Sequence, residues 1–152
     1  MPTGFTRFAE ALRAGSEIYH ALGKILKERG SSTGVGDEGG YAPMLKRDEA
    51  ALAMIVAAIE KAGYVPGTDF MIAIDAASSE WFDEDKGVYH LPKADKIMRR
   101  EELVAMWQQF SEKYPIISLE DGMGETDWEG WAMLTKAIGD KVQLVGDDLF
   151  VT

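Results

Sequence analysis

Cysteine is absent from this 152-residue sequence, and histidine occurs only twice, at His20 and His90. Without cysteine the chain can form neither a disulfide framework nor a zinc–thiolate site, which is typical of proteins from a reducing compartment. His20 falls in a predicted helix and His90 in a predicted loop. We expect a surface or packing role for both side chains.

Basic residues are also scarce, with 16 Lys and Arg against 26 Asp and Glu and a net charge of −10. This balance argues against nucleic acid or an anionic membrane as a main partner, because both bind basic surfaces. An anionic substrate would need metal cations or a local basic pocket. No apolar run approaches the length of a membrane span, and residues 1–4 do not begin a signal peptide. We therefore expect a cytoplasmic protein.

Hydrophobic residues make up 46% of the chain, which is enough to bury a core in one ordinary domain. Apolar residues three or four apart predict helices, and short continuous apolar runs predict strands. The expected helices are 6–29, 47–62, 100–113 and a fourth that starts at the N-cap Asp127 and ends at Gly139. The expected strands are 70–74, 116–119 and 142–146.

Several details of these elements can be predicted as well. Thr6 is the expected N-cap of the first helix and Gly30 its stop, with Phe8, Leu12, Tyr19, Leu22, Ile25 and Leu26 forming its apolar stripe. The strand 70–74 is apolar throughout, so we expect it to be buried on both faces. Residues 76–96 form a polar connection with a small hairpin, and Trp128 and Trp131 are expected in the core.

From residue 70 onward, predicted strands and helices alternate. This order is typical of right-handed crossovers and a parallel sheet, and therefore of the α/β class. An acidic residue follows each of the three predicted strands: Asp75, Glu120 and Asp147. The carboxyl ends of parallel strands lie at one edge of the sheet, about 4.8 Å apart between neighbours. Three carboxylates can therefore converge there.

A single acid after a strand is most simply explained as a turn or helix cap. Three in register would repel one another, so their arrangement makes sense chiefly with a cation present. Oxygen ligands favour Mg²⁺ or Mn²⁺ over zinc. Asp148, beside Asp147, is expected to hold the loop or to support the ligand.

A second acidic feature lies in the loop 31–43, where Asp37 and Glu38 are flanked by Gly36, Gly39 and Gly40. Glycine allows backbone conformations that other residues disfavour and lets a ligand approach closely. Composition alone leaves open whether Glu38 is a catalytic group or a solvated loop acid.

Four segments together resemble enolase, the glycolytic phosphopyruvate hydratase. They are residues 34–43 (GVGDEGGYAP), 74–80 (IDAASSE), 114–122 (YPIISLEDG) and 145–152 (VGDDLFVT). The Glu120-Asp121-Gly122 version resembles bacterial members of the family. The resemblance covers nearly the whole chain and implies a partial TIM-type barrel, with about three parallel strands alternating with four helices.

The resemblance implies a role for each acid. Glu38 matches the general acid of the family, and Asp75, Glu120 and Asp147 match the ligands of the Mg²⁺ that holds the substrate carboxylate. The implied reaction converts 2-phospho-D-glycerate, a small phosphorylated three-carbon acid, to phosphoenolpyruvate and water. In the family a lysine removes the C2 proton, and Glu38 would protonate the departing C3 hydroxyl. The parent protein is expected to be a homo-oligomer.

Length is where the chain departs from the family, because a complete barrel needs about 250 residues. We expect residues 1–152 to be an incomplete section of the barrel domain, without the N-terminal lid domain, the remaining strands or the lysine base. Alone it is expected to be inactive. Two alternatives remain open at this point: another enolase-superfamily enzyme, although the Lys-x-Lys pair usual there is missing, and a non-catalytic binding or scaffold module.

Overall fold

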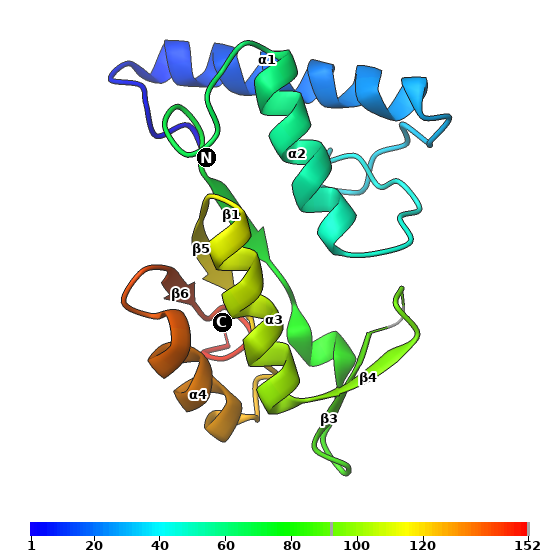
Figure 1. The fold of residues 1–152 in the computed structure, drawn as a ribbon, viewed down its shortest axis with the longest axis vertical. Helices are drawn as coiled ribbons and strands as arrows, with labels where there is room; N and C mark the ends of the chain where they lie inside the picture. The colour runs from blue at the N-terminus through cyan, green and yellow to red at the C-terminus, as the bar shows by residue number, and fades with distance from the viewer. Residues whose placement is uncertain (92, 152) are drawn as a thin grey trace. The chain divides into compact units, whose positions relative to one another are not determined.

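The computed structural model describes residues 1–91 and 93–151, and the chain divides into two compact units, Met1–Met71 and Ile72–Thr152 (Figure 1). Thr152, which ends the last of the four motifs, lies outside the described residues. Among the described residues no helix combines the length and apolar character needed to cross a membrane.

The first unit is built on two helices, α1 (Phe8–Glu28) and α2 (Glu49–Lys61), which pack against each other. Ala14, Ile59 and Phe70 form one buried cluster, and Ala21, Ile25 and Ala58 form another. The small side chains of Ala14, Ala21 and Ala58 let the two helix backbones approach closely. Both helices fall within the predicted ranges.

The ends of α1 test the predicted caps. Gly30 has φ +68°, its N–H donates to the Lys27 carbonyl, and the Ser31 N–H donates to the Leu26 carbonyl, which is a Schellman motif. The stop at Gly30 is therefore confirmed. The cap at Thr6 is wrong, because Arg7 occupies the N-cap position and makes no side-chain cap bond.

The predicted apolar stripe of α1 is wrong in its first turns. Phe8 and Leu12 are 82% and 62% exposed, whereas Ala14, Ala21, Ile25 and Leu26 are buried. The face that α2 covers is therefore the alanine-rich one, which a search for large apolar side chains overlooks.

The second unit contains a parallel sheet of β1 (Ile72–Asp75), β5 (Ile116–Glu120) and β6 (Gln143–Val145), in the order β1-β5-β6. Both pairings are parallel, as predicted, and the α/β fold class is confirmed. The expectation that the first strand is buried on both faces is wrong, because Ala73 is exposed. Within the described residues β1 is an edge strand, and it starts at Ile72 rather than at Phe70.

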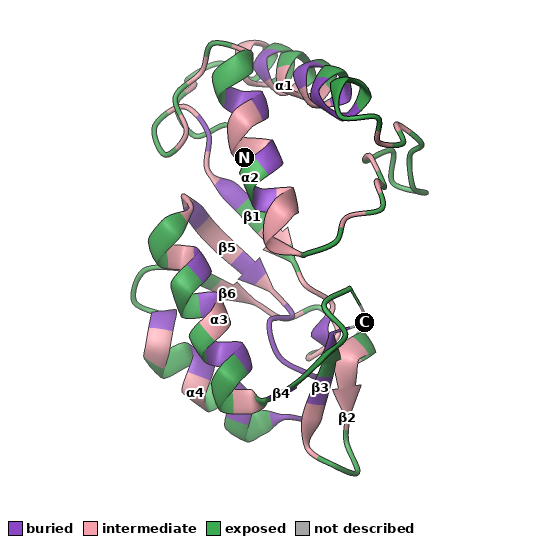
Figure 2. Cartoon of the chain, turned by 45° about the vertical axis from the view of Figure 1, so that its right-hand side comes forward, coloured by how far each residue is buried: buried purple, intermediate pink, exposed green. Residues whose placement is uncertain are grey.

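Helices α3 (Arg100–Lys113) and α4 (Trp128–Ile138) pack against each other, and α3 also contacts β5. Figure 2 shows buried residues along both helices and on β5. The Asp127 carboxylate accepts from the Gly130 N–H, which confirms this residue as the N-cap of α4. Trp131 is buried, as expected, but Trp128 is 66% exposed and does not belong to the core.

The connection between β1 and α3 is more ordered than predicted. A 3₁₀ helix, Ser78–Trp81, leads into an antiparallel sheet of β2 (Phe82–Asp83), β3 (Val88–Leu91) and β4 (Lys96–Arg99). The expected hairpin is β2 and β3. The strand β4 was not predicted, because a four-residue segment with a charged residue at each end gives little pattern to detect.

A buried hydroxyl joins this antiparallel sheet to the loop that follows β5. Tyr89 of β3 is fully buried, its O–H donates to Asp127 Oδ2 at 2.7 Å, and it accepts from the Gly124 N–H at 3.0 Å. Asp127 Oδ1 also lies 3.2 Å from Nη2 of Arg100. Burial raises the pKa of Tyr89, so the hydroxyl keeps its proton and remains a donor.

Replacing Tyr89 with phenylalanine tests this connection. The change leaves the Gly124 N–H and one Asp127 oxygen buried without a partner, so we expect Tyr89→Phe to lower the free energy of unfolding by about 1–3 kcal/mol. Urea denaturation followed by circular dichroism measures it. The matched control is Tyr64→Phe, whose hydroxyl donates to Glu17 at an exposed position. An equal loss in both variants would contradict the importance of the buried bond.

Candidate metal centre

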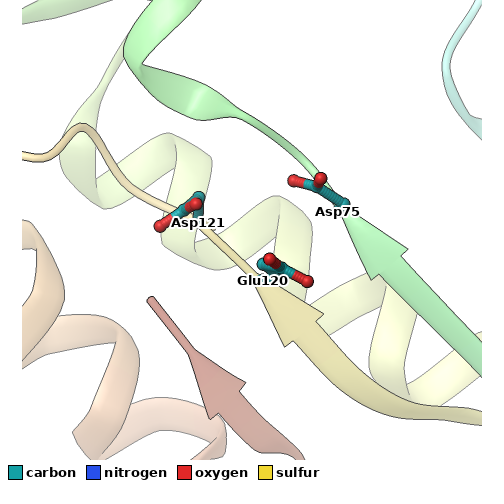
Figure 3. Close-up of side chains that lie close together, drawn as sticks. All are labelled: Asp75, Glu120 and Asp121. Carbon is teal, nitrogen blue, oxygen red and sulfur yellow. The ribbon is translucent and has the colours of Figure 1, made fainter. Parts of the chain in front are cut away.

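The strands β1 and β5 place two of the predicted acids side by side. Asp75 and Glu120 are each the last residue of their strand, and the register pairs them directly. Together with Asp121 they form a group in which one carboxylate oxygen from each residue lies within 4.8 Å of the others (Figure 3). The sheet thus concentrates negative charge at the carboxyl ends of its strands.

Backbone hydrogen bonds continue beyond the strand ends and fix the loops that follow. The Ala76 N–H donates to the Glu120 carbonyl at 2.9 Å, the Ser78 N–H to the Asp121 carbonyl at 3.0 Å, and the Asp121 N–H to the Val145 carbonyl at 3.0 Å. The segments after β1 and β5 are therefore joined to each other, and the segment after β5 is joined to the end of β6.

Asp121 is the residue of this group that the sequence analysis did not single out. Asp121 is 3% exposed, and its Oδ2 accepts from the N–H groups of Asp147 at 3.3 Å and Asp148 at 3.0 Å. Its Oδ1 is buried without a hydrogen-bond partner among the described residues. The available signal was a second acid directly after the strand that ends in Glu120.

Crowding of carboxylates shifts the protonation of Glu120. Desolvation raises the pKa of Glu120 above its ordinary value, and the charges of Asp75, Asp121, Asp147 and Asp148 raise it further. A cation would reverse this effect by favouring the ionised form. The edge of the sheet is therefore electrostatically suited to a positive ligand.

Asp148 shares this environment. Its pKa is raised by desolvation and by the charges of Asp121, Asp147, Asp75 and Glu80. Asp148 and Glu80 thus add to the negative field around the cluster.

Asp147, the third predicted ligand, lies in the loop after β6 and is exposed. It is close enough to Glu120 to raise the pKa of that residue, but Asp121 takes the third place in the group of close carboxylates. The structure thus brings Asp75 and Glu120 together. Asp147 as a metal ligand remains a prediction.

Glu38 belongs to the first unit, where it is exposed at the tip of a turn. The Gly39 N–H donates to the Gly36 carbonyl at 2.9 Å and the Gly36 N–H to the Gly40 carbonyl at 2.9 Å, with Gly39 at φ +81°. The Tyr19 hydroxyl donates to the Gly39 carbonyl at 3.1 Å and ties this turn to α1. The role of Glu38 as a general acid remains a prediction.

The donor set fits Mg²⁺. This ion is bound in proteins through carboxylates and water, and here three carboxylates converge without sulfur or imidazole among their ligand atoms. The buried, unpartnered Oδ1 of Asp121 is an independent sign that a positive partner belongs in this region.

The comparison with known families agrees with this arrangement. The family model described as "Enolase, C-terminal TIM barrel domain" matches residues 1–152. The strands and helices are accordingly those of a partial TIM-type barrel, and active sites of such barrels lie at the carboxyl ends of the strands. This match also supports a lyase-type function of the enolase superfamily. The chain therefore belongs to the enolase family, within its C-terminal TIM barrel domain.

Proposed function

We propose that this chain is part of a Mg²⁺-dependent enolase that interconverts 2-phospho-D-glycerate and phosphoenolpyruvate plus water. The observation that carries the proposal is the convergence of acids at the carboxyl edge of the parallel sheet, in a chain of the enolase family. We place the activity in the whole protein. The lysine base of the family has no counterpart in these 152 residues, so the chain alone is expected to be inactive.

In this proposal Asp75, Glu120 and Asp147 would hold the metal. Bound Mg²⁺ would supply positive charge that stabilises the negative charge developing on the substrate carboxylate. The chain's own contribution is to bring the ligands together: strand register aligns Asp75 with Glu120, and backbone bonds hold the loops that follow. Fixed ligands need no reorganisation when charge develops.

Glu38 would donate the proton that lets the C3 hydroxyl of the substrate leave as water. Its position at the tip of a glycine-flanked turn leaves the carboxyl group accessible to a ligand. The bond from the Tyr19 hydroxyl to the Gly39 carbonyl restricts the turn beside Glu38, which helps to orient a proton donor.

The metal ligands can be tested by isothermal titration of the chain with Mg²⁺. We expect Asp75→Asn and Glu120→Gln each to weaken Mg²⁺ binding by at least about tenfold, because each removes one charged ligand. Asp140→Asn is the matched control: it removes one exposed negative charge before β6, at the opposite end of the strand from the cluster. Equal affinities in all four proteins would contradict the assignment.

The raised pKa of Glu120 predicts how stability depends on pH without metal. Above the raised pKa, folding forces the charge of Glu120 against its neighbours, so metal-free Glu120→Gln should be more stable than the wild type. As the pH falls through the raised pKa toward the ordinary value of 4.5, this difference should narrow, because the wild-type group also becomes neutral.

Urea denaturation in EDTA from pH 8 to pH 4 measures this difference between the two proteins. At neutral pH, saturating Mg²⁺ should make the wild type more stable than Glu120→Gln, because the ion binds the folded wild type more tightly than the folded variant. A difference that is constant across this pH range would show that Glu120 does not experience the predicted repulsion.

The proton donor can be tested in an established enolase whose matching section is replaced by residues 1–152. Phosphoenolpyruvate formation, followed by ultraviolet absorbance, should be retained in this chimera. Glu38→Gln should lower kcat by about 10²–10⁴-fold, the usual contribution of a general acid. Asp37→Asn, at the neighbouring position, should have a much smaller effect. A larger loss in Asp37→Asn than in Glu38→Gln would overturn the role of Glu38 as proton donor. Turnover by the isolated chain would overturn the expectation that the chain alone is inactive.

A further inference from the structure

Asp121 connects the carboxylate cluster with the loop that carries Asp147. Its Oδ2 accepts two hydrogen bonds from that loop, one from the N–H of Asp147 and one from the N–H of Asp148. Its backbone N–H donates to the Val145 carbonyl at the end of β6. A single residue therefore fixes both the end of β6 and the first turn beyond it.

The backbone of Asp121 is held in an uncommon conformation. Its φ is +44°, in the left-handed region that aspartate tolerates better than most non-glycine residues. Such a conformation persists only where the surroundings fix it. Here the Asp121 N–H donates to the last residue of β6 and its carbonyl accepts from the Ser78 N–H, so the backbone that carries the side chain is held on both sides.

The two carboxylate oxygens of Asp121 have different environments. Oδ2 accepts hydrogen bonds from the loop after β6, whereas Oδ1 is buried and has no donor among the described residues. Asp75 and Glu120 each bring a carboxylate oxygen within 4.8 Å of a carboxylate oxygen of Asp121. Charge on Asp121 also strengthens the bonds from the two backbone amides.

We infer that Asp121 is a positioning residue, which holds Asp147 beside Asp75 and Glu120 and couples cation binding at the cluster to the order of the Asp147–Asp148 loop. A cation bound by Oδ1 would fix the orientation of the Asp121 carboxylate, and Oδ2 of the fixed carboxylate would hold the loop amides more firmly. The coupling part of this inference rests on the Mg²⁺ site proposed above. The positioning part rests on the hydrogen bonds alone.

Two substitutions separate these parts. Asp121→Asn keeps an oxygen that can accept from the amides but removes the charge, whereas Asp121→Ala removes both. Hydrogen exchange of the Asp147 and Asp148 amides, resolved by NMR on the 152-residue chain, reports the order of the loop directly and does not require turnover. Asp140→Asn serves as the charge-matched control.

In EDTA we expect Asp121→Ala to lose about tenfold of the protection at both amides, as the loss of a hydrogen bond to a charged group implies, while Asp121→Asn retains most of it. Added Mg²⁺ should raise the protection in the wild type and in Asp140→Asn, and should raise it clearly less in Asp121→Asn, where Asp147 can still bind the ion but the Asp121 carboxylate is lost. The amides of β5, measured in the same spectra, show whether each variant stays folded.

Unchanged protection in a folded Asp121→Ala chain overturns the positioning role. If Asp121→Ala does not fold, the test is made with Asp121→Asn. A Mg²⁺-induced rise in amide protection equal to that of the wild type would overturn the coupling. Absence of Mg²⁺ binding to the wild type in calorimetry would instead remove the proposed metal site. The comparison in EDTA would then still decide whether Asp121 positions the loop.

Discussion

Repulsion between carboxylates at one edge of a parallel sheet is the constraint on which the second unit depends. Strand register aligns Asp75 with Glu120, and the loops add Asp121, Asp147 and Asp148 to the same negative field. Folding without a cation must work against this repulsion. The hydrogen bonds that join the loops keep these charges together at the edge of the sheet.

Much of this arrangement could be predicted from the sequence because its signals are periodic or positional. Alternating apolar runs and helical stripes predicted the parallel sheet, and the acids after each run predicted the edge at which the carboxylates gather. The Gly30 and Asp127 caps were correct because each depends on a few neighbouring residues. The resemblance to enolase, carried by four ordered segments, was confirmed at the level of the family.

What the sequence did not predict depends on contacts between distant residues. Asp121 joined the cluster because Oδ2 meets the amides of the loop after β6, which no local pattern reveals. Trp128 and Phe8 are exposed although their spacing matches a buried stripe, since the packing partner of each helix decides which face is covered. The strand β4 is defined by its pairing with β3 rather than by its own residues.

The buried hydroxyl of Tyr89 has a consequence for how this region can vary. Because it bonds to Gly124 and Asp127, the small antiparallel sheet acts as a brace for the loop that begins directly after Glu120. The exposed tip between β2 and β3 takes no part in this brace, so insertions or deletions there are tolerable. A change in the register of β3 is not tolerable, since it would move the hydroxyl away from Gly124 and Asp127 and loosen the loop beside the carboxylate cluster.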